Sequence, residues 1–385
     1  MNKKTQIVFN LNNFLLSISN ALDYKAKEYL NTSLGHSKRV AYISLKIANE
    51  LNLSNEDKFD LCAYSLCANL GLYESKSISK EFCELSQEYC DKLPFQNQKN
   101  YILKYSHEKI DGSGVFGLKN DEIPLFSQIL SFANLLDINF DLSNNSLENI
   151  KKINEFIKTN SGVLFKEEFA NYFLKYSANT SFWLDLQNEN EILFFIFSNL
   201  LDYSKVLNFD ELLDITCIFD KIDSKNSELL VILEKVVDYY GFEYKDKMTL
   251  LITASLSKLG KFTIPSSILN KKNRLEDYEY ELVKSYPYYN KKFLSNIIGF
   301  NDISIWASKV QETLDGKGYP YSFEAKDLSL KERVLSCAII YSSLIANKPY
   351  REAYSHNKTI EIMKGMASNN KIDLTVVKDF ENILE

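Results

Sequence analysis

The sequence predicts an all-α fold. Apolar residues recur at the spacing of amphipathic helices along most of the chain. Few runs alternate between apolar and polar residues with a period of two, and none of them is bracketed by the turns that close a β-hairpin. The 385 residues, of which 45% are apolar, are too many for one small domain and suit two domains of ordinary size.

Two consecutive helices are predicted near the N-terminus. The first spans residues 36–53 and places its apolar residues on one face. Ser54 then caps a second helix, which carries Asp57 in its first turn and stops at Gly71. The apolar residues are Val40, Ile43, Ile47 and Leu51 in the first helix, and Phe59, Leu61, Ala63, Leu66 and Leu70 in the second.

Four later stretches are interpreted as connections. Residues 139–149 are rich in Asn and Ser and predict a loop, and residues 160–162 predict another. The aromatic stretch 182–186 is interpreted as an anchor that ties a connection to a core. The junction between the two domains is predicted within residues 186–208.

Composition excludes several classes of partner and location. The net charge is −6 and there is no long basic run, which argues against nucleic acid or an anionic membrane as the main partner. No apolar stretch is long enough to predict a transmembrane helix, and residues 7–16 make a poor signal peptide because three asparagines interrupt them. A cytoplasmic location is therefore expected. The six cysteines form no CxxC pair and are expected to be buried, reduced thiols.

Two glycine-rich stretches share one pattern. Residues 311–320 and residues 107–117 both contain Glu-x-x-Asp-Gly-x-Gly, which predicts a tight turn between helices. Each is followed by a run that ends in an apolar helix, at residues 125–137 in the first half and 330–346 in the second. This repetition predicts an internal duplication.

Further motifs in the same order give the chain a family resemblance. The segments 66–72 and 256–261 precede the two turns, and the order of signals resembles that of the HD-GYP phosphodiesterases, with two such units in tandem. The resemblance implies helical domains over residues 12–180 and 205–385, with 181–204 as the connection. The second half carries most of the motifs: Ile268-Leu269-Asn270-Lys271, Tyr286-Pro287, Ile297-Ile298-Gly299-Phe300, the glycine turn, Arg333-Val334-Leu335 and Lys348-Pro349-Tyr350-Arg351.

The resemblance also implies a metal cluster, most often of iron or manganese, held by His nitrogens and Asp oxygens. Such a cluster activates a water for attack on a phosphodiester. In the first half only His36 and His107 stand at these ligand positions. The other positions hold Ala68 and Asn69, Phe82, Ser106 and Asn134.

The second half has lost more of the implied ligands. Lys258 puts a cation where the family has a metal-bridging carboxylate, which opposes the binding of a dication. No His occurs between Lys225 and Tyr239, where the leading His is expected. No cofactor is therefore expected, and His36 and His107 are remnant candidates for a single metal. The remaining replacements are Ser257, Tyr286, Val310, Gln311 and Ile339.

The second glycine turn survives although the metal ligands near it do not. In one interpretation Asp315 caps a helix corner and the glycines take positive φ. In the other, the turn and nearby cations contact a phosphate or a guanine, because Lys and Arg suit phosphate oxygens. The candidate ligand-binding residues are Lys258, Lys261, Glu312, Asp315, Gly316, Gly318, Tyr319, Lys348 and Arg351.

Three functions are compatible with these residues. The leading hypothesis is a catalytically inactive protein of bacterial cyclic-dinucleotide signalling, which binds cyclic di-GMP or another cyclic dinucleotide or acts as a scaffold for a signalling protein. The second is a residual metal-dependent cyclic di-GMP phosphodiesterase that uses His36 and His107. The third is a protein-interaction module without a nucleotide ligand.

Overall fold

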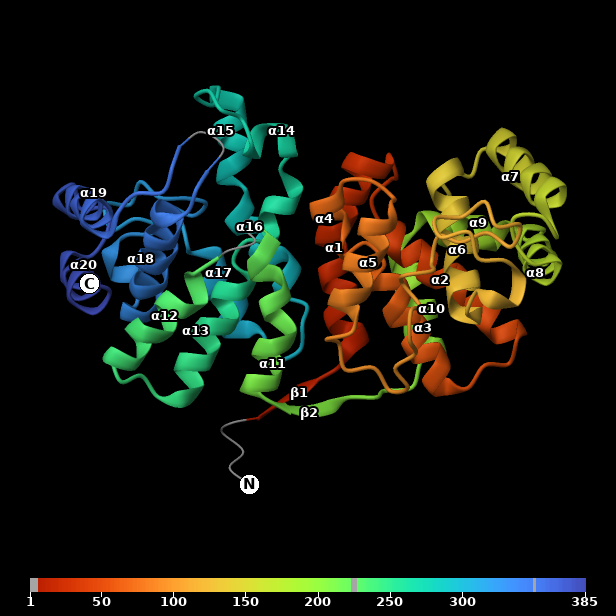
Figure 1. Cartoon of the computed structure of the whole chain (residues 1–385), viewed down its shortest axis with the longest axis horizontal. Helices are drawn as coiled ribbons and strands as arrows, with labels where there is room; N and C mark the ends of the chain where they lie inside the picture. Colours follow the sequence, from red (N-terminus) through yellow and green to blue (C-terminus); the bar gives the residue numbers. More distant parts are fainter. Residues whose placement is uncertain (1–5, 223–226, 349–350) are drawn as a thin grey trace. The chain divides into compact units, whose positions relative to one another are not determined.

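A computed structural model of the chain describes residues 6–222, 227–348 and 351–385 (Figure 1). The described residues are mostly helical, so the predicted all-α class is confirmed. The chain divides into two compact units. The N-terminal unit comprises Asn10–Ser204, and the C-terminal unit comprises Lys205–Glu385 together with Met1–Phe9.

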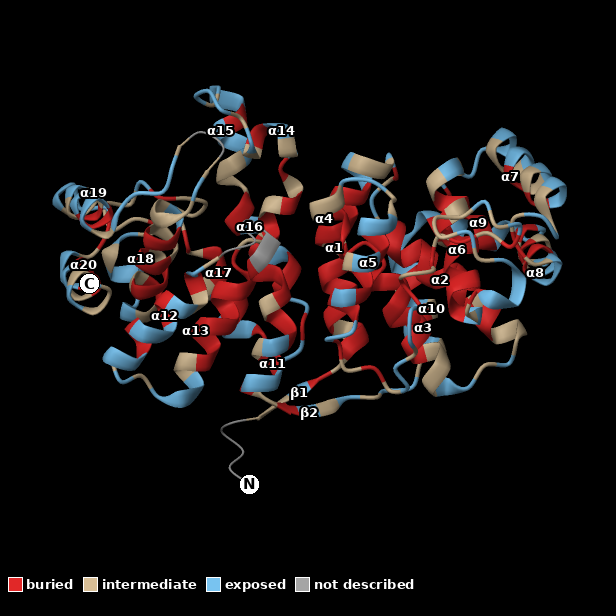
Figure 2. Cartoon of the chain, viewed as in Figure 1, coloured by how far each residue is buried: buried red, intermediate tan, exposed pale blue. Residues whose placement is uncertain are grey.

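The N-terminal unit is built around helix α2 (His36–Glu50), which is buried along most of its length (Figure 2). Helix α2 packs against α3, α6 and α10. The cap predicted for the next helix is present, since the Ser54 hydroxyl accepts a hydrogen bond from Asp57 N at 3.1 Å. The other elements are α1 (Leu11–Leu30), α3 (Asn55–Cys67), α4 (Leu72–Ser75), α5 (Lys80–Cys90), η2 (Asn120–Glu122), α6 (Leu125–Phe140), α7 (Leu147–Asn160), α8 (Glu167–Ser177), α9 (Thr180–Gln187) and α10 (Glu189–Asn199).

The C-terminal unit is built around helix α13 (Tyr244–Leu256), which is buried from Met248 onward and packs against α11, α12, α17 and α18. Its other elements are β1 (Gln6–Phe9), β2 (Lys205–Asn208), α11 (Phe209–Thr216), η3 (Cys217–Ile222), α12 (Leu229–Tyr239), η4 (Leu259–Thr263), α14 (Ser266–Leu269), α15 (Asp277–Lys284), α16 (Tyr286–Leu294), α17 (Asn301–Ser308), η5 (Ala325–Asp327), α18 (Leu330–Ile345), α19 (His356–Ser368) and α20 (Leu374–Ile383).

A two-stranded antiparallel sheet differs from the prediction. Strand β1 pairs with β2 in the register Gln6 with Asn208 and Phe9 with Lys205. The sequence did not indicate this sheet, because residues 10–204 separate its two strands in the sequence and no hairpin turn joins them. The segment at the start of the chain therefore belongs to the C-terminal unit.

The segment 181–204, predicted as a connection, is largely helical. It holds most of α9 and all of α10, and α10 packs against α2. The expected aromatic anchor lies in α9, where Phe182, Trp183 and Leu186 are buried and Trp183 Nε1 donates to Ser177 O at 2.9 Å. The predicted loop 139–149 is shorter than expected, since α6 continues to Phe140 and α7 begins at Leu147.

Two expectations from composition concern the cysteines and membrane-spanning helices. Five of the six cysteines are buried and none of the six forms a disulfide, whereas Cys217 is partly exposed. Within the described ranges, no helix has both the length and the apolar character needed to cross a membrane.

Candidate functional site

The first glycine turn is held by two carboxylates. Glu108 accepts hydrogen bonds from Phe116 N at 2.6 Å and from Leu118 N at 2.8 Å. Asp111 accepts one from Ser113 N at 2.8 Å, which lowers the pKa of its carboxyl. The glycine after Asp111 has a φ of +85°, which favours glycine at this position.

The second glycine turn has the same frame. Glu312 accepts hydrogen bonds from Tyr321 N at 2.8 Å and Phe323 N at 3.0 Å. Asp315 accepts one from Lys317 N at 3.1 Å, and the glycine that follows it has a φ of +71°. The carboxylates of this turn therefore bind the backbone of the turn itself. The structural interpretation expected Asp315 to cap a helix and both glycines to take positive φ, but Asp315 binds within the turn and only Gly316 of the two glycines has a positive φ.

The last glycine of each turn is required by close packing and not by a positive φ. A Cβ at Gly318 would lie 2.4 Å from Glu312 Cα, and a Cβ at Gly114 would lie 2.5 Å from Glu108 Cα. Of the predicted ligand-binding residues, Glu312, Asp315, Gly316 and Gly318 thus shape the turn. Tyr319 also belongs to it, and its hydroxyl is 3.1 Å from Gln311 Oε1.

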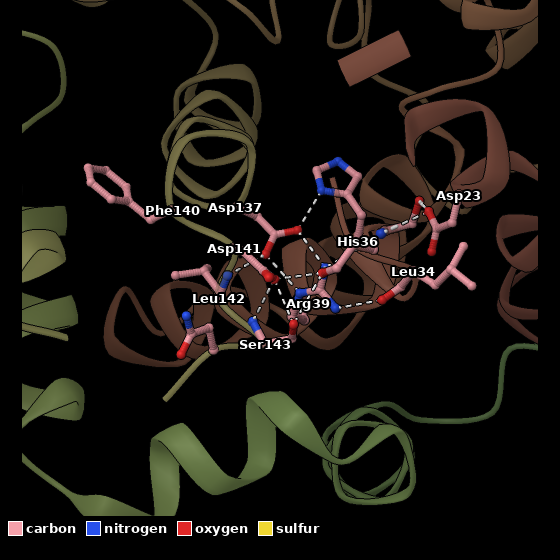
Figure 3. A network of polar contacts seen from close by, with 12 residues as sticks. Asp23, Leu34, His36, Arg39, Asp137, Phe140, Asp141, Leu142 and Ser143 are labelled. Atoms are coloured by element: carbon pink, nitrogen blue, oxygen red, sulfur yellow. Dashed lines mark hydrogen bonds and ion pairs between the residues drawn. The ribbon is translucent and has the colours of Figure 1, made fainter. Parts of the chain in front are cut away.

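The N-terminal unit also holds a buried polar network between α2 and α6 (Figure 3). His36 Nδ1 is 2.7 Å from Asp137 Oδ2, and Arg39 donates to both oxygens of the same carboxylate, from Nε at 2.7 Å and from Nη2 at 2.9 Å. Burial by itself raises the pKa of the Asp137 carboxyl, but the hydrogen bond with His36 and the charge of Arg39 hold it at about 2. The carboxylate is therefore ionised and fully paired at neutral pH.

Sequence reasoning missed Asp137. The residue at the position of the family's late Asp is Asn134, and Asp137 lies one helical turn further along α6. The signal was present, because His36 and Arg39 lie three residues apart on α2 and so share a face. Figure 3 shows the second ring nitrogen of His36 pointing away from Asp137. A carboxylate that holds one imidazole nitrogen in this way is typical of metal-ligating histidines.

Several buried side-chain polar atoms of the N-terminal unit have no hydrogen-bond partner among the described residues. Three of them are His107 Nε2, Asn69 Nδ2 and Asn134 Nδ2, and these three residues stand where the family resemblance places metal ligands. Burial, with a smaller contribution from His36, lowers the pKa of His107 from 6.5 to about 4. His107 is thus neutral at pH 7, as a metal ligand must be. Its ring also borders a cavity of about 320 Å³.

These residues do not fit the cluster of two or three metals that the resemblance implies. Asp137 is engaged by Arg39 and His36, and the remaining groups are two imidazoles and two carboxamides without an anionic oxygen to bridge metals. Over the part of the chain that the structure describes, no group of three or more His, Cys, Asp or Glu side chains is placed to hold a metal ion. Two imidazoles suit at most a single ion.

Behind the second turn lies a cavity of about 270 Å³. It brings together Lys258, Lys261 and Lys348, three of the predicted ligand-binding residues. Lys258 and Lys261 belong to one segment at η4, and Lys348 comes from the segment after α18. Its lining also includes Ser257, Tyr286 and Gln311, which occupy positions where the resemblance expects metal ligands. This donor set carries positive charge and does not fit a metal cluster either.

Other residues position the cavity wall. Asn290 of α16 donates to Ser257 O at 2.6 Å and to Ala307 O at 3.0 Å, and accepts from Gly260 N at 2.7 Å. These bonds join α16 to the end of α13 and to α17. Lys258 Nζ is 3.2 Å from Asp220 Oδ1, a buried carboxylate that sequence reasoning did not single out.

Arg351 is not part of the cavity lining. Its guanidinium donates to the backbone oxygens of Ser343 at 2.6 Å and of Leu344 and Glu352 at 2.9 Å. These contacts fix the segment after α18, so the structure assigns Arg351 a role in holding the backbone. Two other motif residues, Pro349 and Tyr350, lie outside the described residues. The same holds for residues 225–226, at the start of the segment where the leading His was expected.

Comparison with known proteins supports the resemblance. The sequence profile of a family described as "HD domain" matches residues 24–139 and 217–376. The 3′3′-cGAMP-specific phosphodiesterase 1 of Vibrio cholerae serotype O1 is 21% identical over 95% of this chain and 90% of that protein. The cyclic di-GMP phosphodiesterase PdeB of Borreliella burgdorferi is 29% identical over 41% of each chain.

A solved structure matches nearly the whole fold. It is a crystal structure of cyclic GMP-AMP specific phosphodiesterases of V. cholerae, which aligns with 98% of this chain and 98% of its own, with a TM-score of 0.67 and 20% identity. Because the sequence identity is only 20%, this likeness shows a shared fold and no more. Together with the matched profile it confirms the family resemblance drawn from the motifs.

Proposed function

The chain belongs to the HD domain family, and on this premise we propose that it binds a cyclic dinucleotide in the cavity of the C-terminal unit. The observation that carries the proposal is that Lys258, Lys261 and Lys348 line one cavity. The names of the similar proteins, which are cyclic di-GMP and 3′3′-cGAMP phosphodiesterases, support a ligand of this class.

The charge of the cavity suits a phosphodiester. Lysine ammonium groups bind phosphate oxygens by charge-assisted hydrogen bonds, which are about twice as strong as neutral ones. Asp220 offsets part of the charge of Lys258, and Glu228 also lines the cavity, but the three lysines outnumber these two carboxylates. A ligand held in this way needs no metal to neutralise its phosphates.

Hydrolysis is the second candidate function. The names of the relatives favour it over the catalytic inactivity predicted from the sequence, and they support the alternative of a metal-dependent phosphodiesterase. In this chain the observation that favours it is His36, which is oriented by Asp137, together with a neutral His107. The donor sets do not fit a metal cluster, so hydrolysis in this chain would depend on at most the single ion that two imidazoles can hold.

The test uses the full chain, purified without chelator and analysed for iron, manganese and zinc. Cyclic di-GMP and 3′3′-cGAMP are titrated by calorimetry with and without EDTA, and the products are separated after incubation with Mn²⁺. We expect binding that persists in EDTA and falls about tenfold or more in Lys261→Met and in Lys348→Met. Lys272→Met, an exposed lysine of the same unit, is the matched control.

Each outcome separates the candidates. If no heat is seen with either nucleotide, the cavity is not a dinucleotide site, and an interaction module without a nucleotide becomes the better account. A linear product that depends on Mn²⁺ and is lost in His36→Ala assigns hydrolysis to the N-terminal unit. If a single metal is found, His36→Ala and His107→Ala should each release it, because either change removes half of the imidazole ligands.

A further inference from the structure

We propose that Tyr280, on α15 of the C-terminal unit, forms a stacking site for one purine base of the bound nucleotide. This inference rests on the proposed function, since it extends the lysine cavity by a second subsite. It concerns a residue outside the cavity lining and outside every motif that the sequence analysis used.

The cavity is small for a cyclic dinucleotide. About 270 Å³ is less than the 300–1,000 Å³ that pockets for drug-sized ligands usually have. A cyclic dinucleotide carries two phosphates, two sugars and two bases and is larger than such a ligand. If its phosphates lie against the lysines, at least one base must lie on the surface around the cavity.

A chain of contacts leads from the cavity to Tyr280. Gln311 lines the cavity, its Nε2 donates to the Tyr286 hydroxyl at 2.9 Å, and its Oε1 accepts from the Tyr319 hydroxyl at 3.1 Å. Burial raises the pKa of Tyr319, so this hydroxyl stays protonated and remains a donor. The ring of Tyr280 meets the Tyr319 ring edge-on, with 6.5 Å between centroids and 81° between planes.

The exposure of Tyr280 suits stacking. The residue is 50% exposed, and its contact with Tyr319 keeps the ring in place. Lys284 Nζ lies over the ring at 5.8 Å from its centroid, so a base would stack on the opposite face. Helix α15 is itself fixed, because Glu279 accepts from Glu276 N at 2.7 Å and pairs with Lys271 at 2.6 Å. A ring held on a fixed helix loses little conformational entropy when a base stacks on it.

The test compares a whole nucleotide with a probe that has no base. Binding of cyclic di-GMP and of inorganic pyrophosphate is measured by calorimetry for the wild type, Tyr280→Ala, Tyr280→Phe and Tyr278→Ala. Tyr278 is the matched control, because it is 61% exposed on the same helix but two residues away, and so it faces a different direction.

We expect Tyr280→Ala to weaken cyclic di-GMP binding by about 5- to 150-fold, the range for loss of one base–aromatic stack. Pyrophosphate binding should not change, Tyr280→Phe should retain affinity for both ligands, and Tyr278→Ala should resemble the wild type. If the wild type binds cyclic di-GMP and Tyr280→Ala binds it equally well, the stacking site is wrong and the lysine cavity stands. An equal loss for pyrophosphate would also overturn the stacking site. If the wild type binds neither cyclic di-GMP nor 3′3′-cGAMP, both proposals fail; if it binds 3′3′-cGAMP alone, the same variants are compared with that nucleotide.

Discussion

In the N-terminal unit the residue three positions after Asn134 is Asp137, whereas in the C-terminal unit the residue three positions after Ile339 is Ser342. Asp137 is buried and paired with Arg39 and His36. Ser342 instead contributes to the wall of the lysine cavity. Next to the position where the family resemblance places the late Asp, one unit thus has a closed, charge-balanced network and the other has a lysine-lined cavity.

The glycine turns next to these places have not diverged in the same way. Glu108 and Glu312 each accept hydrogen bonds from two backbone N–H groups of their own turn. None of these bonds involves a residue at a position where the family resemblance places a metal ligand. The comparison therefore teaches that the frame of the fold and the chemistry of its interior depend on separate side chains, so one can be kept while the other changes.

The largest effect is expected from removing the centre of the N-terminal network. Asp137→Ala would leave the buried Arg39 without its carboxylate, and losing one partner of a buried ion pair costs about 3–5 kcal/mol. Peptide-resolved hydrogen exchange should show this loss in the N-terminal unit. Ser342→Ala is the matched change in the C-terminal unit and should cost less than about 1 kcal/mol. Equal losses in the two units would contradict the comparison.

A smaller effect is expected from pH. The pKa of His107 falls from 6.5 to about 4 on folding, so the unfolded chain binds the proton more tightly. The stability contributed by neutral His107 is complete above pH 6.5 and is lost as pH falls toward 4. Because the ring borders a cavity, we expect roughly 1–3 kcal/mol for this loss.

The measurement of this pH effect uses the position of the two tryptophans. Trp183 lies in α9 and Trp306 in α17, so urea unfolding of a Trp306→Phe variant followed by fluorescence reports the N-terminal unit. His107→Gln in that background should remove the dependence between pH 6.5 and 4. An unchanged dependence would assign the titration to other groups.

The smallest effect should be shared by both units. Glu108→Gln and Glu312→Gln keep the shape of the side chain but leave one acceptor oxygen for two backbone N–H donors, so one bond is lost and the other becomes neutral. We expect a cost of about 1 kcal/mol each, because the donor residues are half-buried and water can reach the freed N–H. Hydrogen exchange of the two turns measures both changes. A response in only one unit would show that the two frames are not equivalent.

Several features could be predicted from sequence because they depend on neighbouring residues. Ser54 caps its helix through a bond to a residue three positions away. Asp315 and the glycine after it form their turn within a few residues. Local spacing determines such features, so periodicity and turn chemistry indicate them directly.

Other features could not be predicted, because their partners are distant in sequence. Strand β1 pairs with β2 although the sequence of the whole N-terminal unit separates the two strands. Asp137 reaches α2 from α6, and Asp220 reaches Lys258 from η3. Arg351 was expected to bind a ligand, but it donates to backbone oxygens. The pattern of charges along the sequence does not show whether an arginine will bind backbone oxygens or a phosphate.

The sequence by itself determined the helices, the two glycine turns and the membership in the HD domain family, because periodicity, turn residues and ordered motifs are properties of short stretches. Tertiary structure alone decided what the ligand positions became. It brought Lys348 to the same cavity as Lys258 and Lys261, and it enclosed His36, Arg39 and Asp137 in one network. The physical reason is that charge and burial act through space, so the effect of a side chain depends on which neighbours folding brings to it.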